Sequence, residues 1–106
     1  MNMLEKNTEA IHNLCKKHKV AKLYAFGSVL TSAFNHGSDI DFLIEFERNE
    51  IPDFASNYFE LLFALEDLLG REVDLIEYKA IQNPYFKEEI DETRKLIFES
   101  PKNILQ

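Results

Sequence analysis

The sequence predicts an α/β fold in which helices flank a small mixed β-sheet of three to four strands. Segments with helical periodicity alternate with short strand-like segments, and residues 40–46 show a clear period of two. The 106 residues suffice for one domain with a modest core, so we expect a single domain over residues 1–106.

The first half of the chain is expected to contain two helices and two strands. Ile11 and Leu14 belong to an apolar repeat with helical spacing. Ile40, Phe42 and Ile44 recur at every second position, as on a strand with one apolar face. The expected elements are a helix at 3–18, a strand at 20–26, a short helix at 29–34, a turn at 35–38 and a strand at 40–46.

The second half continues the alternation with two further helices and two further strands. Asp53 is a favourable N-cap, and Gly70 is a favourable residue just past a helix end. Asn83 followed by Pro84 indicates another helix start. The expected elements are a helix at 54–69, a strand at 73–78, a helix at 84–93 and a last strand at 96–99, with a continued helix as the alternative.

Composition narrows the class of protein. Lys and Arg number 12 against 19 Asp and Glu, and the formal charge of −7 disfavours direct binding to nucleic-acid phosphates. The lone Cys15 excludes an internal disulfide and is expected to pack in the first helix. The N-terminus lacks the apolar stretch of a signal peptide, and no apolar run approaches the roughly 20 residues of a membrane span. We therefore expect a cytoplasmic protein with no membrane partner.

Three aspartates are candidate metal ligands. Asp39 and Asp41 are two residues apart, so on a strand they project to one face, opposite the apolar residues that pack on helices. We expect this carboxylate face to be open, and Asp74 to share it if its strand neighbours that of Asp41. Adjacent carboxylates repel unless a cation lies between them, and three can hold two Mg²⁺ ions about 3.5–4 Å apart, the arrangement used for in-line phosphoryl or nucleotidyl transfer.

The pair Gly27-Ser28 follows the first strand and is a candidate phosphate-binding turn. Glycine lets the backbone approach a ligand closely, and free N–H groups with a serine hydroxyl favour an anion such as a triphosphate. No Gly-Lys-Ser/Thr sequence of the Walker type is present. Each of these features alone is common in turns and on solvated strands. Their joint order along the chain is what favours a functional site.

That order, Gly27-Ser28, ten residues, then Asp39-x-Asp41, resembles the signature of the DNA polymerase beta-type nucleotidyltransferases. The flanking sequences narrow the resemblance to the minimal nucleotidyltransferases, or MNT proteins. They are LYAFGSVLTSAFNHGSDIDFLIEF, GREVDLIEY and NPYFKEEI. The similarity extends from about Tyr24 to Phe98 and matches the small size of that family.

The resemblance implies a nucleotidyltransferase fold, an enzymatic activity and a partner. Many MNT proteins are antitoxins encoded with a HEPN-domain toxin, typically a ribonuclease, and members transfer AMP from ATP to a tyrosine of the toxin. By this resemblance, Asp39, Asp41 and Asp74 are the catalytic residues and the ligands of two Mg²⁺ ions. Gly27 and Ser28 hold the phosphates of ATP.

The pattern departs from the family at Val29, where an arginine is often found. An arginine there would neutralise triphosphate charge, and Lys22 and Arg71 are candidates to replace it. A non-catalytic antitoxin that acts by binding is the alternative that Val29 favours. A nucleotidyltransferase for small molecules is another.

The helix expected at 54–69 has a broader apolar surface than packing against one core requires. Phe59 and Phe63 fall outside its main apolar arc. Either a loop covers them, or they are scattered exposed residues of an ordinary kind, or they form a surface for a partner or for self-association, which leaves a homo-oligomer open.

Overall fold

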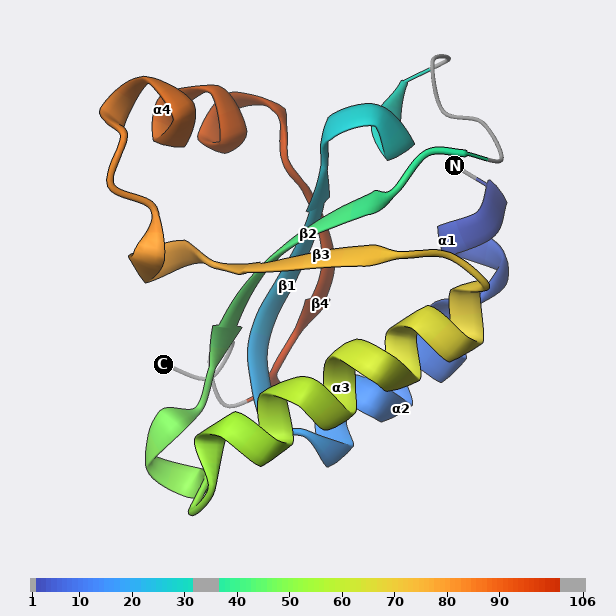
Figure 1. Cartoon of the computed structure of the whole chain (residues 1–106), viewed down its shortest axis with the longest axis vertical. Helices are drawn as coiled ribbons and strands as arrows, with labels where there is room; N and C mark the ends of the chain where they lie inside the picture. The colour runs from blue at the N-terminus through green and yellow to red at the C-terminus, as the bar shows by residue number, and fades with distance from the viewer. Residues whose placement is uncertain (1, 32–36, 102–106) are drawn as a thin grey trace.

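Figure 1 shows a computed structural model of the chain, which describes residues 2–31 and 37–101. Within these residues the strands form one four-stranded sheet in the order β3-β2-β1-β4, with β2 and β3 parallel and the other pairs antiparallel. The predicted α/β class with a small mixed sheet is confirmed. The elements are α1 (Asn2–Lys6), α2 (Thr8–Lys17), β1 (Val20–Phe26), β2 (Ile40–Phe46), α3 (Phe54–Leu69), β3 (Val73–Glu77), α4 (Pro84–Thr93) and β4 (Lys95–Glu99).

Most element bounds agree with those predicted, including the last strand, and the helix caps explain why. The Asp53 carboxylate accepts a hydrogen bond from the Ser56 amide at the start of α3, and Gly70 ends that helix with a φ of 66°. Asn83 caps α4 by accepting hydrogen bonds from two amides of its first turn. These side chains act within a few residues of their own position, so their effect is readable from sequence.

Two predicted helices differ from those observed. The expected helix at 3–18 is divided into α1 and α2 at Asn7, whose side-chain amide donates to the Met3 carbonyl at 2.8 Å. The short helix expected at 29–34 is instead a 3₁₀ turn over Gly27–Leu30, which begins two residues earlier. Residues 32–36, which include the rest of that helix and part of the expected turn at 35–38, lie outside the described residues.

The main core lies between one face of the sheet and helices α1, α2 and α3, which share that side in Figure 1. Cys15 is fully buried there, and burial raises the pKa of its thiol to about 12, so it packs as a small apolar residue. The helices contribute Leu4, Ile11, Cys15, Leu61, Leu65 and Leu69, and the strands contribute Leu23, Ile40, Phe42, Ile44, Val73, Leu75 and Phe98.

The opposite face of the sheet was expected to be open, and this expectation is wrong in part. Helix α4 packs over it through a second, smaller core of Phe26, Leu43 and Ile90. Leu43 has the same parity on β2 as Asp41, so one face of that strand carries both an apolar contact and a carboxylate. The carboxylates therefore lie beside a covering helix rather than on a bare surface.

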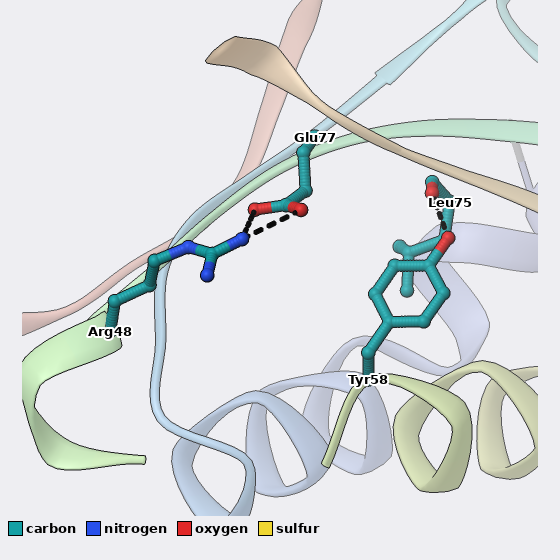
Figure 2. Close-up of polar contacts among 4 residues, drawn as sticks. All are labelled: Arg48, Tyr58, Leu75 and Glu77. Carbon is teal, nitrogen blue, oxygen red and sulfur yellow. Dashed lines mark hydrogen bonds and ion pairs between the residues drawn. The ribbon is translucent and has the colours of Figure 1, made fainter. Parts of the chain in front are cut away.

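The outer edge of β3 is closed by side chains of α3. The Tyr58 hydroxyl donates a hydrogen bond to the Leu75 carbonyl, as Figure 2 shows. The Val73 amide donates to the Glu66 carboxylate at 3.1 Å. Backbone groups that would otherwise be available to another strand are thus occupied by a helix of the same domain.

Two further contacts involve the edge strand β4 and the end of β3. On β4, a ring nitrogen of His12 from α2 lies 2.8 Å from the Ile97 carbonyl oxygen. At the end of β3, Arg48 donates two hydrogen bonds of 3.1 Å to the Glu77 carboxylate (Figure 2). Within the described part of the chain, no helix is both long and apolar enough to cross a bilayer.

Candidate active site

Asp41 and Asp74 occupy matched positions on neighbouring strands. In the parallel pair β2–β3, Asp41 lies directly opposite Asp74, and adjacent strands are about 4.8 Å apart. Val73 and Leu75 are buried in the main core, so Asp74 between them projects to the other face, where it is exposed. The structure therefore brings these two carboxylates together on the α4 side of the sheet.

Asp39 joins this pair from the segment just before β2, where its side chain is exposed. The charges of Asp39 and Asp74 both affect the pKa of Asp41. Partial burial raises the pKa of the Asp41 carboxyl, and the negative charges of Asp74 and then Asp39 raise it further. Repulsion of this kind is expected when carboxylates lie close to one another.

The donor set has the chemistry that Mg²⁺ prefers. Carboxylate oxygens suit this ion, which keeps several waters and accepts substrate phosphates as its remaining ligands. Among residues 2–31 and 37–101, no three His, Cys, Asp or Glu side chains are already arranged around a common metal position. Asp41 and Asp74 are thus an aligned pair of candidate ligands rather than a preformed cage.

Gly27 lies where the end of β1 passes Asp41, since Phe26 is paired with Asp41 across β1–β2. Its φ is 75°, and a Cβ built on it would lie 2.6 Å from Asp41 Oδ2, well inside a normal contact. Sequence reasoning attributed this glycine to close approach of a ligand. The structure shows a nearer cause, because the Asp41 carboxylate itself occupies the space that a side chain would need.

Ser28 lies within the 3₁₀ turn and is half-buried. Its carbonyl accepts hydrogen bonds of 2.9 Å from both the amide and the hydroxyl of Thr31, which close the turn at its far end. The first amides of a helical turn have no partner inside it. The turn Gly27–Leu30 begins next to Asp41, and its leading amides are therefore candidates to contact an anion there.

The surroundings of residue 29 explain why a valine, rather than an arginine, follows Gly27-Ser28. This side chain is buried in the main core, so an apolar residue fits its surroundings. Arg71 donates a 3.0 Å hydrogen bond to the Ser38 carbonyl, one residue before Asp39. Lys22 instead lies 3.8 Å from Glu99, toward the opposite end of β1. Of the two candidate replacement cations, Arg71 is the one beside the site.

A cavity of about 660 Å³ opens between the turn Gly27–Leu30 and α4, with Asp41 in its wall. Sequence reasoning missed the residues that α4 contributes to it, which are Phe86, Glu89, Ile90 and Thr93. The available signal was weak, since an aromatic and an aliphatic residue four positions apart also describe an ordinary packed helix face. The cavity makes α4 part of the candidate site.

The family model for polymerase beta nucleotidyltransferases matches residues 9–103, which is most of the chain. The protein therefore belongs to the polymerase beta-type nucleotidyltransferase family. A Methanocaldococcus jannaschii protein, provisionally named a protein adenylyltransferase, is 46% identical over 76 residues, covering 72% of this chain and 75% of that protein. Family membership and the nucleotidyltransferase fold agree with the resemblance found in the sequence.

Solved structures show the same fold. One, provisionally described as a minimal nucleotidyltransferase, has a TM-score of 0.73 at 29% identity, covering 90% of this chain and 95% of that one. A toxin–antitoxin complex with AMP-PNP has a TM-score of 0.68 at 20% identity, with coverage of 92% and 77%. A tri-AMPylated Shewanella oneidensis HEPN toxin in complex with its MNT antitoxin gives 0.63 at 18%, with coverage of 95% and 76%. For these two complexes the likeness concerns the fold.

Proposed function

We propose that this protein transfers AMP from ATP to a tyrosine hydroxyl of a HEPN-domain toxin and acts as that toxin's antitoxin. The observation that carries the proposal is the register that sets Asp41 opposite Asp74, beside a turn where the Gly27 backbone, at a φ of 75°, lies against the Asp41 carboxylate. Family membership supplies the reaction class. The name of the 46% identical relative and the AMPylated toxin of the Shewanella complex support a protein acceptor and this partner.

Asp39, Asp41 and Asp74 would hold two Mg²⁺ ions. The ions would neutralise charge on the triphosphate and lower the pKa of the acceptor hydroxyl. Burial raises the pKa of the Asp41 carboxyl and the charges of Asp74 and Asp39 raise it further; this supports the assignment, because a bound cation would offset the repulsion. Rotation of the exposed side chains of Asp39 and Asp74 would complete the coordination.

The chain's own groups would orient and deprotonate the substrates. Leading amides of the Gly27–Leu30 turn hold the phosphates, and Arg71 adds positive charge next to Asp39. Asp74, exposed on β3, accepts the proton of the tyrosine hydroxyl. The tyrosine oxygen then bonds to the α-phosphorus while the bond from that phosphorus to the pyrophosphate oxygen breaks in line, and pyrophosphate leaves.

The test is transfer of label from α-labelled ATP, with Mg²⁺, to the co-purified HEPN-domain partner. We expect label on a partner tyrosine, with a matching gain in mass. Asp39→Asn and Asp41→Asn should each reduce the rate about 10²-fold or more, because each removes a charged ligand from the site. Asp67→Asn, an exposed carboxylate on α3, is the matched control and should retain activity.

Three outcomes would change the conclusion. Transfer that survives in both Asp variants would refute the site. Neutralisation of the toxin by wild-type protein without label would favour the non-catalytic antitoxin. Label on a small hydroxylated molecule, without any partner, would favour the third alternative.

The partner surface remains a proposal of its own. Phe59 and Phe63 are 50% and 60% exposed on α3, and their rings stack with centroids 6.2 Å apart. No covering loop was found over them among the described residues, which keeps the interpretation as a partner or self-association surface. Because α3 lies on the face opposite the carboxylates, a toxin or second copy bound there would leave the site accessible.

A further inference from the structure

Phe59 and Phe63 form a continuous aromatic surface on the outer side of α3. Both side chains are exposed, and their rings stack on each other with centroids 6.2 Å apart. The Phe59 ring also meets the Tyr58 ring edge-on at a centroid distance of 5.1 Å. Isolated exposed apolar residues are ordinary, whereas large exposed rings in mutual contact are typical of an interaction surface. Phe59 and Phe63 together are the aromatic patch.

Tyr58 connects the aromatic patch to the outer strand of the sheet. Its ring contacts Phe59, and its hydroxyl donates a hydrogen bond to the Leu75 carbonyl on β3 (Figure 2). Burial raises the pKa of the Tyr58 hydroxyl, and the negative charges of Glu77 and Asp74 raise it further. The field of the Asp74 carboxylate thus reaches the side chain that contacts Phe59. A molecule bound to the aromatic patch would therefore lie beside the strand that carries Asp74.

The surroundings of the aromatic patch are strongly acidic. Residues 60–77, which comprise most of α3 and all of β3, contain six acidic residues and one basic residue, Arg71. Arg71 donates a hydrogen bond to the Ser38 carbonyl, on the side of the candidate active site. Most of the chain's formal charge of −7 is therefore concentrated in the segment that carries and borders the patch.

This charge distribution decides between a second copy of the chain and a different protein as the occupant. In a symmetric dimer the aromatic patch of one copy would face the same patch of the other, which would bring two acidic segments together. Like charges opposed across an interface weaken binding, so a second copy is disfavoured. A protein that presents apolar side chains flanked by Lys or Arg would complement both the rings and the charge around them.

We propose that the aromatic patch is the docking surface for the acceptor protein, through a segment that presents apolar side chains flanked by Lys or Arg. The inference rests on the proposed transfer to a protein hydroxyl, and it adds where the acceptor binds and what its docking segment contains. Because β3 is an outer strand, an acceptor held beside it can bring its tyrosine to Asp74 around the edge of the sheet. Phe59 and Phe63 take no part in bond making.

The test is calorimetric binding of the HEPN-domain partner, separated from the complex, together with the KM and kcat of transfer to it. In the double variant Phe59→Ala/Phe63→Ala, the Kd and the KM for the partner should both rise about tenfold or more, because central aromatic contacts dominate such interfaces. The kcat at saturating partner should stay unchanged. Both side chains are exposed, so the melting temperature should stay close to that of the wild type.

Leu96→Ala is the matched control for the double variant. Leu96 is a large apolar residue that is 48% exposed on β4, which is the outer strand at the opposite edge of the sheet from β3. Its truncation removes exposed apolar surface away from the aromatic patch. We expect it to leave the Kd and the KM for the partner unchanged.

Charge reversal tests the chemistry assigned to the docking segment. Glu60 is exposed and adjoins Phe59 in the chain, so Glu60→Lys should weaken partner binding severalfold. The difference from wild type should shrink as the salt concentration rises, because salt screens charges and leaves apolar contacts in place. Equal or tighter binding by Glu60→Lys at low salt would overturn the basic character of the segment.

The outcomes separate this inference from the proposed function. Unchanged partner affinity in the double variant would overturn the docking surface and leave the transfer standing. A wild-type dimer that dissociates in the double variant, measured by sedimentation, with partner affinity unchanged, would assign the aromatic patch to a second copy. Partner binding that depends on the patch but yields no labelled product would uphold the docking surface and refute the transfer. A wild-type protein that neither bound nor labelled the partner would overturn both.

Discussion

The two faces of the sheet are packed in different ways. On the α1–α3 face, residues from three helices and all four strands of the described chain form one continuous core. On the α4 face, the smaller core of Phe26, Leu43 and Ile90 is bordered by carboxylates and a cavity. Most of the apolar packing that stabilises the fold therefore lies on the α1–α3 face. Because of this, the α4 face can carry carboxylates that repel one another and an open cavity.

Core truncation tests this contrast with the largest expected effect. Leu65→Ala on the α1–α3 face should lower the free energy of unfolding by about 3–4 kcal/mol, because dense packing leaves a cavity that cannot collapse. Ile90→Ala on the α4 face should cost about 2 kcal/mol, since Ile90 already borders open space. Urea unfolding of both variants measures the difference, and equal losses would show that the faces are equally packed.

Gly27→Ala probes the close approach of the turn after β1 to Asp41. The new methyl group would meet Asp41 Oδ2 at 2.6 Å in a left-handed backbone, so we expect a loss of about 1–2 kcal/mol of stability together with loss of transfer. Gly70→Ala is the matched control, since Gly70 has a similar φ of 66° but nothing within 4 Å of its added Cβ. It should lose about 1 kcal/mol and keep full activity. Equal activity of the two variants would contradict the assigned role of Gly27.

Asp41→Asn gives the smallest expected effect and has the opposite sign. Because the folded-state pKa of Asp41 is raised, ionisation of its carboxyl destabilises the metal-free protein as pH rises through the unfolded and then the folded pKa. The variant should therefore be slightly more stable than wild type at pH 7, and this advantage should disappear as the pH falls below the pKa of an unfolded Asp, about 4. Thermal melts in a chelator across this range provide the measurement. A stability gain at low pH and none at pH 7 would contradict the inferred repulsion.

Local chemical signals made much of the fold predictable. The N-caps at Asp53 and Asn83, the glycine at position 70 and the period of two in β2 each act over a few residues, and the elements they bound were found as expected. Neighbouring positions for Asp41 and Asp74 could be predicted only on the condition that their strands pair. Whether the two strands pair depends on where the chain places β3 after α3, and the pattern of apolar and polar residues does not determine this.

The coverage of the α4 face could not be predicted for the same reason. Its small core joins Phe26, Leu43 and Ile90 from three separate elements. No sequence pattern around any one of these residues indicates that the other two will contact it. The cavity exists because α4 contacts the sheet at these residues and leaves space nearer the turn. Short-range patterns predict elements, whereas the side chains that complete the site depend on how those elements dock.

The hydrogen bonds from α3 to β3 have a consequence for the assembly of this molecule. A sheet with a bare outer strand recruits foreign strands, and here that strand carries Asp74, so recruitment would bury the proposed entry route of the acceptor. By occupying the Leu75 carbonyl and the Val73 amide, Tyr58 and Glu66 make the domain a poor template for polymerisation. The same two side chains thereby protect the outer edge of the strand that carries Asp74.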